Sequence, residues 1–513
     1  MANRTLFRGL FTGRITGNSE GAPAYALSAE HALAQYAATG CLHQTFYASA
    51  EAQLETLLEL AHMCEPSFVA RVAVHAREHS SMKDAPALLL AVLAGRDTAL
   101  FEQVFDRVVD NTKMLRTFVQ ILRSGVTGRR SFGSLPKRVV RRWLARRTDE
   151  QLFFGDVGNR PSLGDIVRMI HPRPADARRE ALFGYLIGRD HDTAMLPEVV
   201  RAYEAFKLDP TGPAPAVPFA KLTSLPLGRE HWVAIARSLP WTALRINLNT
   251  LLRHGVFNVP GVADEVAARL RDEDSFRRAK AMPYQVMTAL HYTAAEMPRV
   301  IVDALHDVLD RVMSNVPVIE GPVYVCPDVS GSMHWSVSGA RGSASSKVRC
   351  VDVAALVAAS FLRANPQATV LPFDWDVREV RLDARDTIAT NAAKLGGIGG
   401  GGTNCSAPMA KLNRRNAVGD LVVLVSDNES WIDSHRPGRT ELMAEWQQYK
   451  RRNRNARLVC LDVVPNDTTQ AYERPDILNV GGFSDRVFEI ITAFARGELN
   501  EGHWVRRIES IDI

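Results

Sequence analysis

The pattern of apolar residues changes near Gly321, and this change constrains the fold more than any other feature. From about residue 25 to 315, apolar residues recur three and four positions apart, which is typical of amphipathic helices. After Gly321, short apolar runs alternate with helical patterns, which predicts a doubly wound parallel sheet. The sequence therefore predicts an all-α domain over residues 1–320 and an α/β domain over residues 321–513.

The first domain reads as many antiparallel helix pairs with weak internal similarity. Helical spacing is clear in residues 54–63, 68–77, 104–122 and 262–270, and Gly and Pro mark the turns. Strand patterns are nearly absent, and no clean repeat period is visible. We expect an α-solenoid, and the length of 513 residues also favours more than one core.

The second domain reads as apolar strands and helices in alternation. The expected strands are 322–327, 368–373, 420–426, 456–464 and 477–480, and the expected helices are 347–364, 439–452 and 484–496. In doubly wound sheets, ligands bind at the carboxyl ends of the strands. Side chains that directly follow these strands are therefore candidates for a site.

Small oxygen-bearing side chains stand at such positions. The set comprises two carboxylates and three hydroxyls, from Asp328, Ser330, Ser332, Thr403 and Asp427. The first three occupy alternate positions after a strand, where a loop can turn them toward one point. The fourth follows a glycine run, and the fifth ends the next apolar run. Hard divalent cations prefer oxygen ligands, so the set predicts a site for Mg²⁺, with Mn²⁺ or Ca²⁺ as alternatives.

This set resembles the metal-ion-dependent adhesion site (MIDAS) of a von Willebrand factor A domain, over about residues 321–513. In that family the ion completes its shell with water or with a partner's carboxylate, so the resemblance implies docking and not catalysis. The alternative is that Asp, Ser and Gly are ordinary turn residues. A P-loop is excluded because no Lys-Ser/Thr pair follows the glycines.

Basic residues are concentrated in the first domain. The net charge is only +5, but residues between Asp110 and Asp149 include basic side chains and no acidic one. Residues 128–147 read GRRSFGSLPKRVVRRWLARR, and Pro136 suits the first turn of a helix. On a helical wheel, Val139, Val140, Trp143 and Leu144 form one face. The opposite, cationic face and the loop before it contribute Arg129, Arg130, Lys137, Arg138, Arg141, Arg142 and Arg146.

We expect this cationic face to bind the phosphates of RNA. The alternative is a solvated surface, or one paired with acids from neighbouring helices. A second segment, Ser162 to Pro172, predicts a helix with a capping box formed by Ser162 and Asp165. Arg168 and His171 fall near its end and are further RNA-binding candidates, although a lone His is more often structural.

Six cysteines without a CxxC pair argue against a zinc site and a disulfide framework, and favour buried thiols in the cytoplasm. No apolar stretch reaches the length of a membrane span, and the N-terminus lacks a secretory apolar core. We therefore expect a cytoplasmic protein without a membrane partner.

The chain resembles the Ro-type TROVE (telomerase, Ro and vault) proteins. The resemblance rests on residues 40–47, 72–94, 133–143 and 165–172, together with the metal-site set. It implies a monomeric ring of HEAT-like helical repeats closed by the A domain. It also implies that Y-type small RNAs bind the outer basic surface, and that single-stranded 3′ ends of misfolded or unprocessed RNAs enter the ring. In RNA quality control, processing or decay, bacterial relatives act beside an exoribonuclease, polynucleotide phosphorylase.

Two other functions are open to this chain. One is a protein-interaction scaffold that recruits partners through the metal site, against which the acid-free cationic face counts. The other is a metallohydrolase, which the absence of a His cluster and of an evident general base disfavours. We therefore expect a non-catalytic RNA-binding protein.

Overall fold

A computed structural model describes most of the chain. The described residues are 14–39, 45–158, 160–279, 281, 283–312, 316–337, 340–341, 344–345, 348–432, 439–464, 466–482, 486–498 and 503–513. Residues 40–44, which belong to the first segment of the family resemblance and include Cys41, lie outside this set. The other five cysteines are buried and reduced, as expected. Among the described residues, no helix is long and apolar enough to cross a membrane.

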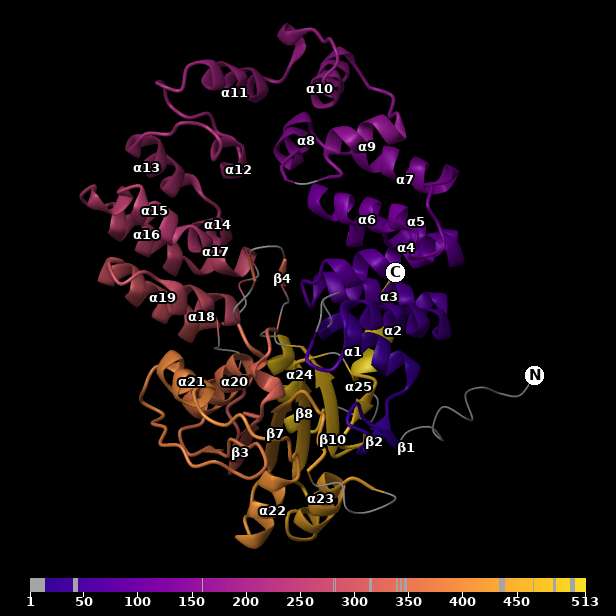
Figure 1. The fold of residues 1–513 in the computed structure, drawn as a ribbon, viewed down its shortest axis with the longest axis vertical. Helices are drawn as coiled ribbons and strands as arrows, with labels where there is room; N and C mark the ends of the chain where they lie inside the picture. The colour runs from indigo at the N-terminus through magenta and orange to yellow at the C-terminus, as the bar shows by residue number, and fades with distance from the viewer. Residues whose placement is uncertain are drawn as a thin grey trace. The chain divides into compact units, whose positions relative to one another are not determined.

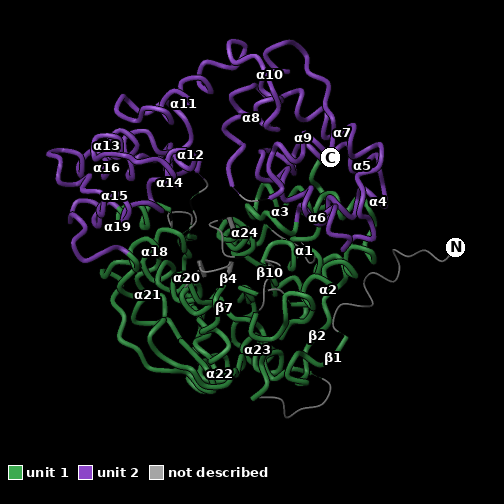
Figure 2. The backbone as a smooth tube through the Cα atoms, turned by 45° about the horizontal axis from the view of Figure 1, so that its top comes forward, with its two compact units in different colours: residues 1–85, 281–292, 305–512 green, residues 86–280, 293–304, 513 purple. Residues whose placement is uncertain are grey.

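The chain divides into two compact units (Figure 2). One unit is helical and contains residues 86–280 and 293–304, with residue 513. The other unit contains residues 1–85, 281–292 and 305–512, so the N-terminal helices belong with the α/β part. The predicted domain boundary between residues 320 and 321 stays a prediction.

The helical unit is a succession of short helices, as the spacing of apolar residues predicted (Figure 1). They are α4 (Asp84–Arg96), α5 (Thr98–Val108), α6 (Thr112–Ser124), α7 (Ser134–Ala145), α8 (Asp149–Gly155), α9 (Leu163–Ile170), α10 (Ala177–Ile187), η3 (Thr193–Met195), α11 (Glu198–Leu208), α12 (Phe219–Leu222), α13 (Arg229–Ser238), α14 (Trp241–Ile246), α15 (Leu248–Arg253), η4 (Val256–Asn258), α16 (Val262–Arg271), α17 (Glu273–Arg278) and α19 (Arg299–Val312). Helices α4 and α19 each extend from one unit into the other.

Local capping explains where these helices start and stop. The apolar pattern of residues 104–122 belongs to two helices, because the Asn111 side chain accepts a hydrogen bond from the Met114 amide and starts α6 afresh. Gly125 then ends α6 in the left-handed conformation, at φ 90°. Within this unit, α5 contacts α7, α6 contacts α8 and α9, and α13 contacts α16. Contacts between neighbours in sequence are the pattern of an α-solenoid.

The other unit begins with β1 and β2 and ends with a parallel sheet and its helices. Its elements are β1 (Ile15–Gly17), β2 (Pro23–Ala26), α1 (Ala29–Thr39), α2 (Ala50–Met63), α3 (Pro66–Glu78), α18 (Pro283–Tyr292), β3 (Val323–Pro327), η5 (Ser332–His334), β4 (Ala340–Arg341), β5 (Ala344–Ser345), α20 (Cys350–Ala364), β6 (Thr369–Val370), α21 (Ile388–Gly396), α22 (Ala407–Arg414), β7 (Leu421–Ser426), α23 (Glu441–Arg452), β8 (Arg457–Asp462), β9 (Thr468–Thr469), β10 (Ile477–Gly481), α24 (Arg486–Ala495) and α25 (His503–Glu509).

Five parallel strands form the sheet, in the order β10-β8-β7-β3-β6. Strand β7 is buried along its whole length, which suits a central strand covered by helices on both faces. Helices α20 and α24 share one face, where Phe361 and Phe488 pack with ring centroids 5.8 Å apart. On the other face, Leu412 of α22 and Trp446 of α23 pack in one core with Leu424 of β7. The predicted doubly wound fold is confirmed.

Two N-terminal strands were not predicted. β1 pairs with β2, and β2 pairs with β9 beyond the parallel sheet, in the register Tyr25↔Thr469. Tyr25 lies in the same apolar core as Leu424 and Trp446. Residues 15–26 therefore contribute to the core of the α/β part, although more than 400 residues separate them from β9 in sequence.

Candidate metal centre and candidate RNA interface

Parallel pairing brings the two predicted carboxylates to the same edge of the sheet. Strands β3 and β7 are neighbours, with Pro327 opposite Val425. Asp328 follows the first strand, and its amide donates to the carbonyl of Val425 at 2.9 Å. Asp427 follows the second strand. Both carboxylates thus lie at the carboxyl ends of adjacent strands, as the sequence predicted.

The serine hydroxyls turn toward these carboxylates. The Ser330 amide donates to Asp328 Oδ1 at 2.8 Å, and the Ser330 and Ser332 hydroxyl oxygens lie 3.2 Å apart. The Ser332 hydroxyl hydrogen bonds the Asp427 carboxylate. The alternate spacing of Asp328, Ser330 and Ser332 therefore places three oxygens around one point beside Asp427.

The glycine run passes alongside this loop. The Gly331 amide donates to the Gly401 carbonyl, and the Gly400 amide donates to the Val329 carbonyl, both at 2.8 Å. Gly399 has a φ of 87°, and a Cβ there would lie 2.2 Å from the Val329 carbonyl oxygen, so the approach requires glycine. Thr403 follows two residues after Gly401 and is buried. The loop pairing brings Thr403 to the same region as the other four residues.

Both carboxyl groups are buried, and neither forms an ion pair within the described residues. Asp328 and Asp427 expose 0% and 2% of their surface. Burial, and next the Asp427 charge, raise the pKa of Asp328 to about 7. Burial likewise raises the pKa of Asp427. Among the described residues, no Lys, Arg or His forms an ion pair with either group. Buried charges need a partner or a metal, and a divalent cation would neutralise both.

A third strand end carries an acid that the sequence analysis missed. Asp374 directly follows the strand predicted at 368–373, is fully buried, and accepts from the Gly401 amide at 3.1 Å. Its carboxylate also receives two hydrogen bonds from Arg378, at 2.7 and 2.8 Å. The rule that ligands bind at the carboxyl ends of the strands would have identified Asp374 from the sequence. Because Arg378 already neutralises it, we leave it out of the metal-ligand set.

The N-terminal segment also reaches this edge, which nothing in the sequence indicated. Asn18 Nδ2 donates to the Ser430 carbonyl at 2.7 Å, and the Ser19 amide donates to Glu429 Oε2 at 2.9 Å. Burial, and next the Asp427 charge, raise the pKa of Glu429 to about 8. The same two causes raise the pKa of Tyr47, so its phenol lies near the site.

The predicted cationic helix exists as α7, and its faces are as expected. Val139, Val140, Trp143 and Leu144 are buried, and the Trp143 indole N–H donates to the Val109 carbonyl at 2.6 Å. Trp143 thus faces the core and cannot stack on a base.

Acids from α5 neutralise part of the cationic face. Glu102 accepts from Arg142 at 2.5 Å and from Arg138 at 3.3 Å, and Asp106 accepts from Arg146 at 2.6 Å. These pairs join residues 36 to 40 positions apart. The acids lie outside the acid-free segment, so the sequence of that segment could not reveal the pairing.

The other predicted basic residues divide into fixed and unpaired side chains. Arg141 donates to the Ile170 carbonyl at 2.8 Å, and Arg129 donates to the Ala94 carbonyl at 2.5 Å. Arg130 is exposed and Lys137 partly exposed, and within the described part of the chain neither side chain forms an ion pair. The structure thus brings the predicted residues to one region but leaves only some of their charge free.

The capping box of α9 forms as predicted, with Ser162 and Asp165 hydrogen bonded reciprocally at 3.0 and 2.9 Å. Arg168 pairs with Asp165 at 3.2 Å. His171 ends the helix in the left-handed conformation, at φ 49°. Its amide donates to the Val167 carbonyl, which gives this residue a structural role as a helix cap.

Comparison with known proteins links this architecture to one family. Residues 323–495 match the family described as the Ro60 vWA domain. The RNA-binding protein RO60 of Deinococcus radiodurans is 26% identical over 95% of this chain and 96% of its own length. The Caenorhabditis elegans protein of the same name is 23% identical over 51% of this chain and 41% of its own length. The crystal structure of the Deinococcus radiodurans RO (RSR) protein superposes with a TM-score of 0.62 and 24% identity, covering 92% of this chain and 100% of that one.

Proposed function

Because this chain belongs to the Ro-type TROVE family, we propose that it is a non-catalytic RNA-binding protein. The observation that carries the proposal is the similarity to the Deinococcus radiodurans RNA-binding protein RO60 along nearly the whole of both chains. The exposed basic side chains of α7 and of the loop before it support it, because cationic faces bind phosphates.

We propose in particular that small structured Y-type RNAs bind this face, and that single-stranded 3′ ends of misfolded or unprocessed RNAs bind inside a closed helical ring. A role in RNA quality control, processing or decay beside polynucleotide phosphorylase follows from the same family resemblance. We further propose a cytoplasmic monomer. The HEAT-like repeats and the closed ring stay predictions.

For the metal centre, we propose that Asp328, Ser330, Ser332, Thr403 and Asp427 hold Mg²⁺, with Mn²⁺ or Ca²⁺ as alternatives. Two buried carboxylates, which form no ion pair with any residue that the structure describes, and a set of hydroxyls match the preference of these ions for oxygen ligands. When bound, the ion would supply positive charge and an open position for a partner's carboxylate. The residues of the chain orient that position and exclude bulk water from it.

RNA binding is tested by gel shift with a stem-loop RNA that carries a single-stranded 3′ tail and with its blunt counterpart, across a salt series. Neutralising the unpaired residues in Arg130→Gln/Lys137→Gln should reduce the salt slope by about 1.8, at about 0.9 per duplex phosphate. The matched control is Arg189→Gln/Arg201→Gln, which removes two other exposed charges of the helical unit. Wild-type protein that binds neither RNA would refute the proposal.

A second candidate function is a protein-interaction scaffold at the metal centre. Trp335 and Trp431 are exposed, and each stands three or four positions after a site residue, Ser332 and Asp427 respectively. A Cβ on Gly402 would meet the Trp431 ring at 2.5 Å, so this ring lies against the glycine run. Exposed aromatic side chains are enriched at protein interfaces. Metal-dependent protein binding that Trp431→Ala abolishes, without any effect on RNA affinity, would favour this function.

A further inference from the structure

A group of basic residues that plays no part in the proposed site lies at the opposite edge of the parallel sheet. In this fold the helices run antiparallel to the strands, so their C-terminal ends lie where the strands begin. Helix α22 ends at Arg414 and α23 ends at Arg452, and the two helices lie side by side (Figure 1). Arg452 Nη2 donates to Asn413 Oδ1 at 2.5 Å, which joins the two helix ends.

Both helix ends are rich in basic residues and lack acids. No Asp or Glu occurs between Asp386 and Asp420, or between Glu445 and Asp462. We define the A-domain basic surface by the six basic residues at these two ends: Lys411, Arg414, Arg415, Arg451, Arg452 and Arg454. The five arginines are exposed, and the lysine is partly exposed.

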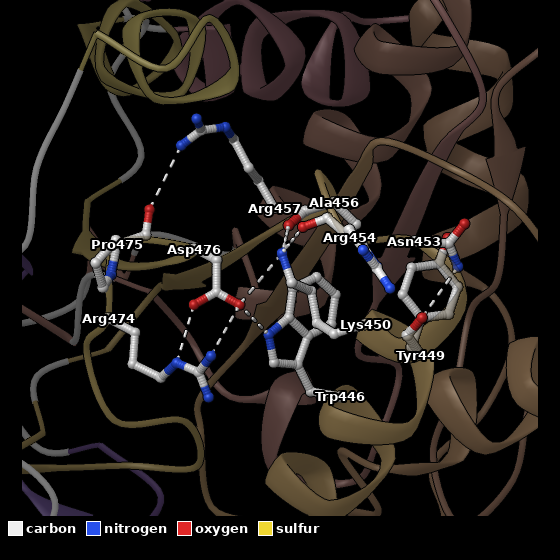
Figure 3. A network of polar contacts seen from close by, with 10 residues as sticks. All are labelled: Trp446, Tyr449, Lys450, Asn453, Arg454, Ala456, Arg457, Arg474, Pro475 and Asp476. Atoms are coloured by element: carbon white, nitrogen blue, oxygen red, sulfur yellow. Dashed lines mark hydrogen bonds and ion pairs between the residues drawn. The ribbon is translucent and has the colours of Figure 1, made fainter.

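Two nearby acids, Asp476 and Glu445, are already engaged by other groups. Figure 3 shows Asp476 between Arg474 and Lys450. Its carboxylate accepts from Arg474 at 2.9 Å and from the Trp446 indole at 3.0 Å, and Lys450 Nζ lies 3.6 Å away. On the other side, Glu445 accepts from Asn413 Nδ2 at 2.6 Å.

Within the described part of the chain, the outward-facing arginines have no acid as an ion-pair partner. Arg414, Arg415, Arg451 and Arg454 form no ion pair with any residue that the structure describes. On α7 and at its C-cap, by contrast, three arginines have carboxylate partners within 3.3 Å. Like charges held together without an acid repel one another, and a polyanion would relieve this repulsion.

Stabilisation of the helix dipoles explains only part of this surface. Basic side chains near a helix C-terminus are favourable, but the effect is confined to the last turn. Arg451 and Arg452 are in the last turn of α23, whereas Arg454 lies beyond it and Arg415 lies beyond the end of α22. A purely local role would not place further unpaired arginines past both helix ends.

We propose that the A-domain basic surface is a second RNA-binding surface that holds the sugar-phosphate backbone. The proposal rests on the proposed function for the identity of the polyanion, but on different residues. The neighbouring aromatic side chains, Trp446 and Tyr449, are fully buried and cannot stack on bases. Binding here is therefore independent of base sequence and accepts duplex as well as single-stranded RNA.

The test uses the full-length protein and a blunt RNA duplex in fluorescence anisotropy titrations over a salt series. The test variant is Arg451→Gln/Arg454→Gln. The matched control, Arg381→Gln/Arg385→Gln, removes two exposed arginines of the same domain that form no side-chain ion pair within the described residues. Losing two phosphate contacts should lower the salt slope by about 1.8 and the affinity by about tenfold or more near 0.15 M salt.

Each outcome decides for or against the surface. A loss confined to the test variant, with unchanged thermal melting, supports it. Unchanged affinity, or an equal loss in the control, overturns it, and an acidic protein would then be the partner to seek. If Arg130→Gln/Lys137→Gln weakens binding of tailed RNA while Arg451→Gln/Arg454→Gln has no effect on either RNA, the proposed function stands and this inference fails.

Discussion

Removing one acid from the helical unit should strengthen RNA binding. Glu102 is the shared partner of Arg138 and Arg142, with oxygen–nitrogen distances of 3.3 and 2.5 Å. The hydrogen bond from Arg142 is the main reason that the pKa of Glu102 lies below its usual range. The Glu102 carboxyl group is therefore charged at neutral pH. In Glu102→Gln, both guanidinium groups lose a competing carboxylate and become available to phosphates.

The size of the effect follows from Coulomb's law. A phosphate bound to either arginine would lie roughly 6 Å from the Glu102 carboxylate. In water, removing a unit negative charge at that distance favours binding by about threefold per phosphate. For two phosphates, the RNA affinity should rise about tenfold at low salt. The gain falls to about threefold near 0.15 M salt, where the screening length is about 8 Å. Folding stability should change little, because exposed ion pairs contribute little.

The assay is an anisotropy titration of tailed stem-loop RNA at two salt concentrations. The control is Glu265→Gln, which frees Arg237 from an exposed ion pair of 2.6 Å elsewhere in the helical unit. Wild-type affinity in Glu102→Gln, or an equal gain in the control, would refute the assignment of α7 as an RNA interface. A gain-of-function readout also excludes misfolding as the explanation.

Three further predictions concern stability. Asp427→Asn should abolish the rise in melting temperature that Mg²⁺ gives relative to EDTA. In EDTA the variant should melt at a higher temperature than the wild type, because it lacks one of two neighbouring buried charges. Gly399→Ala should destabilise the protein in urea by at least about 1–3 kcal/mol through its positive φ, before the clash with Val329 is counted. Trp143→Ala should cost about 3–5 kcal/mol, because the indole is fully buried. Unaltered unfolding midpoints would contradict the last two.

The sequence predicted those parts of the fold that depend on periodicity. The apolar periodicity predicted the helices of the helical unit and the five parallel strands. Pairing between neighbouring strands then places Asp328 and Asp427 at adjacent strand ends. The strand predicted at 368–373 is shorter, with only Thr369–Val370 as β6. Beyond it, Leu371 donates to Val325 and Phe373 to Pro327, so the backbone still follows β3.

What the sequence did not predict depends on tertiary contacts between distant segments. Strands β1 and β2 are three and four residues long, too short for a period-2 pattern to stand out. The contacts of Ser19 with Glu429 and of Asn18 with Ser430 span more than 400 residues. The sequence of neither segment indicates that it contacts the other, because a polar loop residue can face solvent or bond a buried partner.

The distribution of unpaired charge also depends on tertiary contacts, so the sequence alone does not show which basic residues are available to RNA. By composition the basic excess lies wholly before residue 321, and the rest of the chain is neutral. Folding gives Arg138, Arg142 and Arg146 carboxylate partners from α5, which lowers the charge that α7 presents. In the neutral part, acids are buried at the carboxyl ends of the strands, while the A-domain basic surface gathers at the other edge. Phosphates respond to unpaired charge within about one Debye length, so a domain without net charge can still bind RNA.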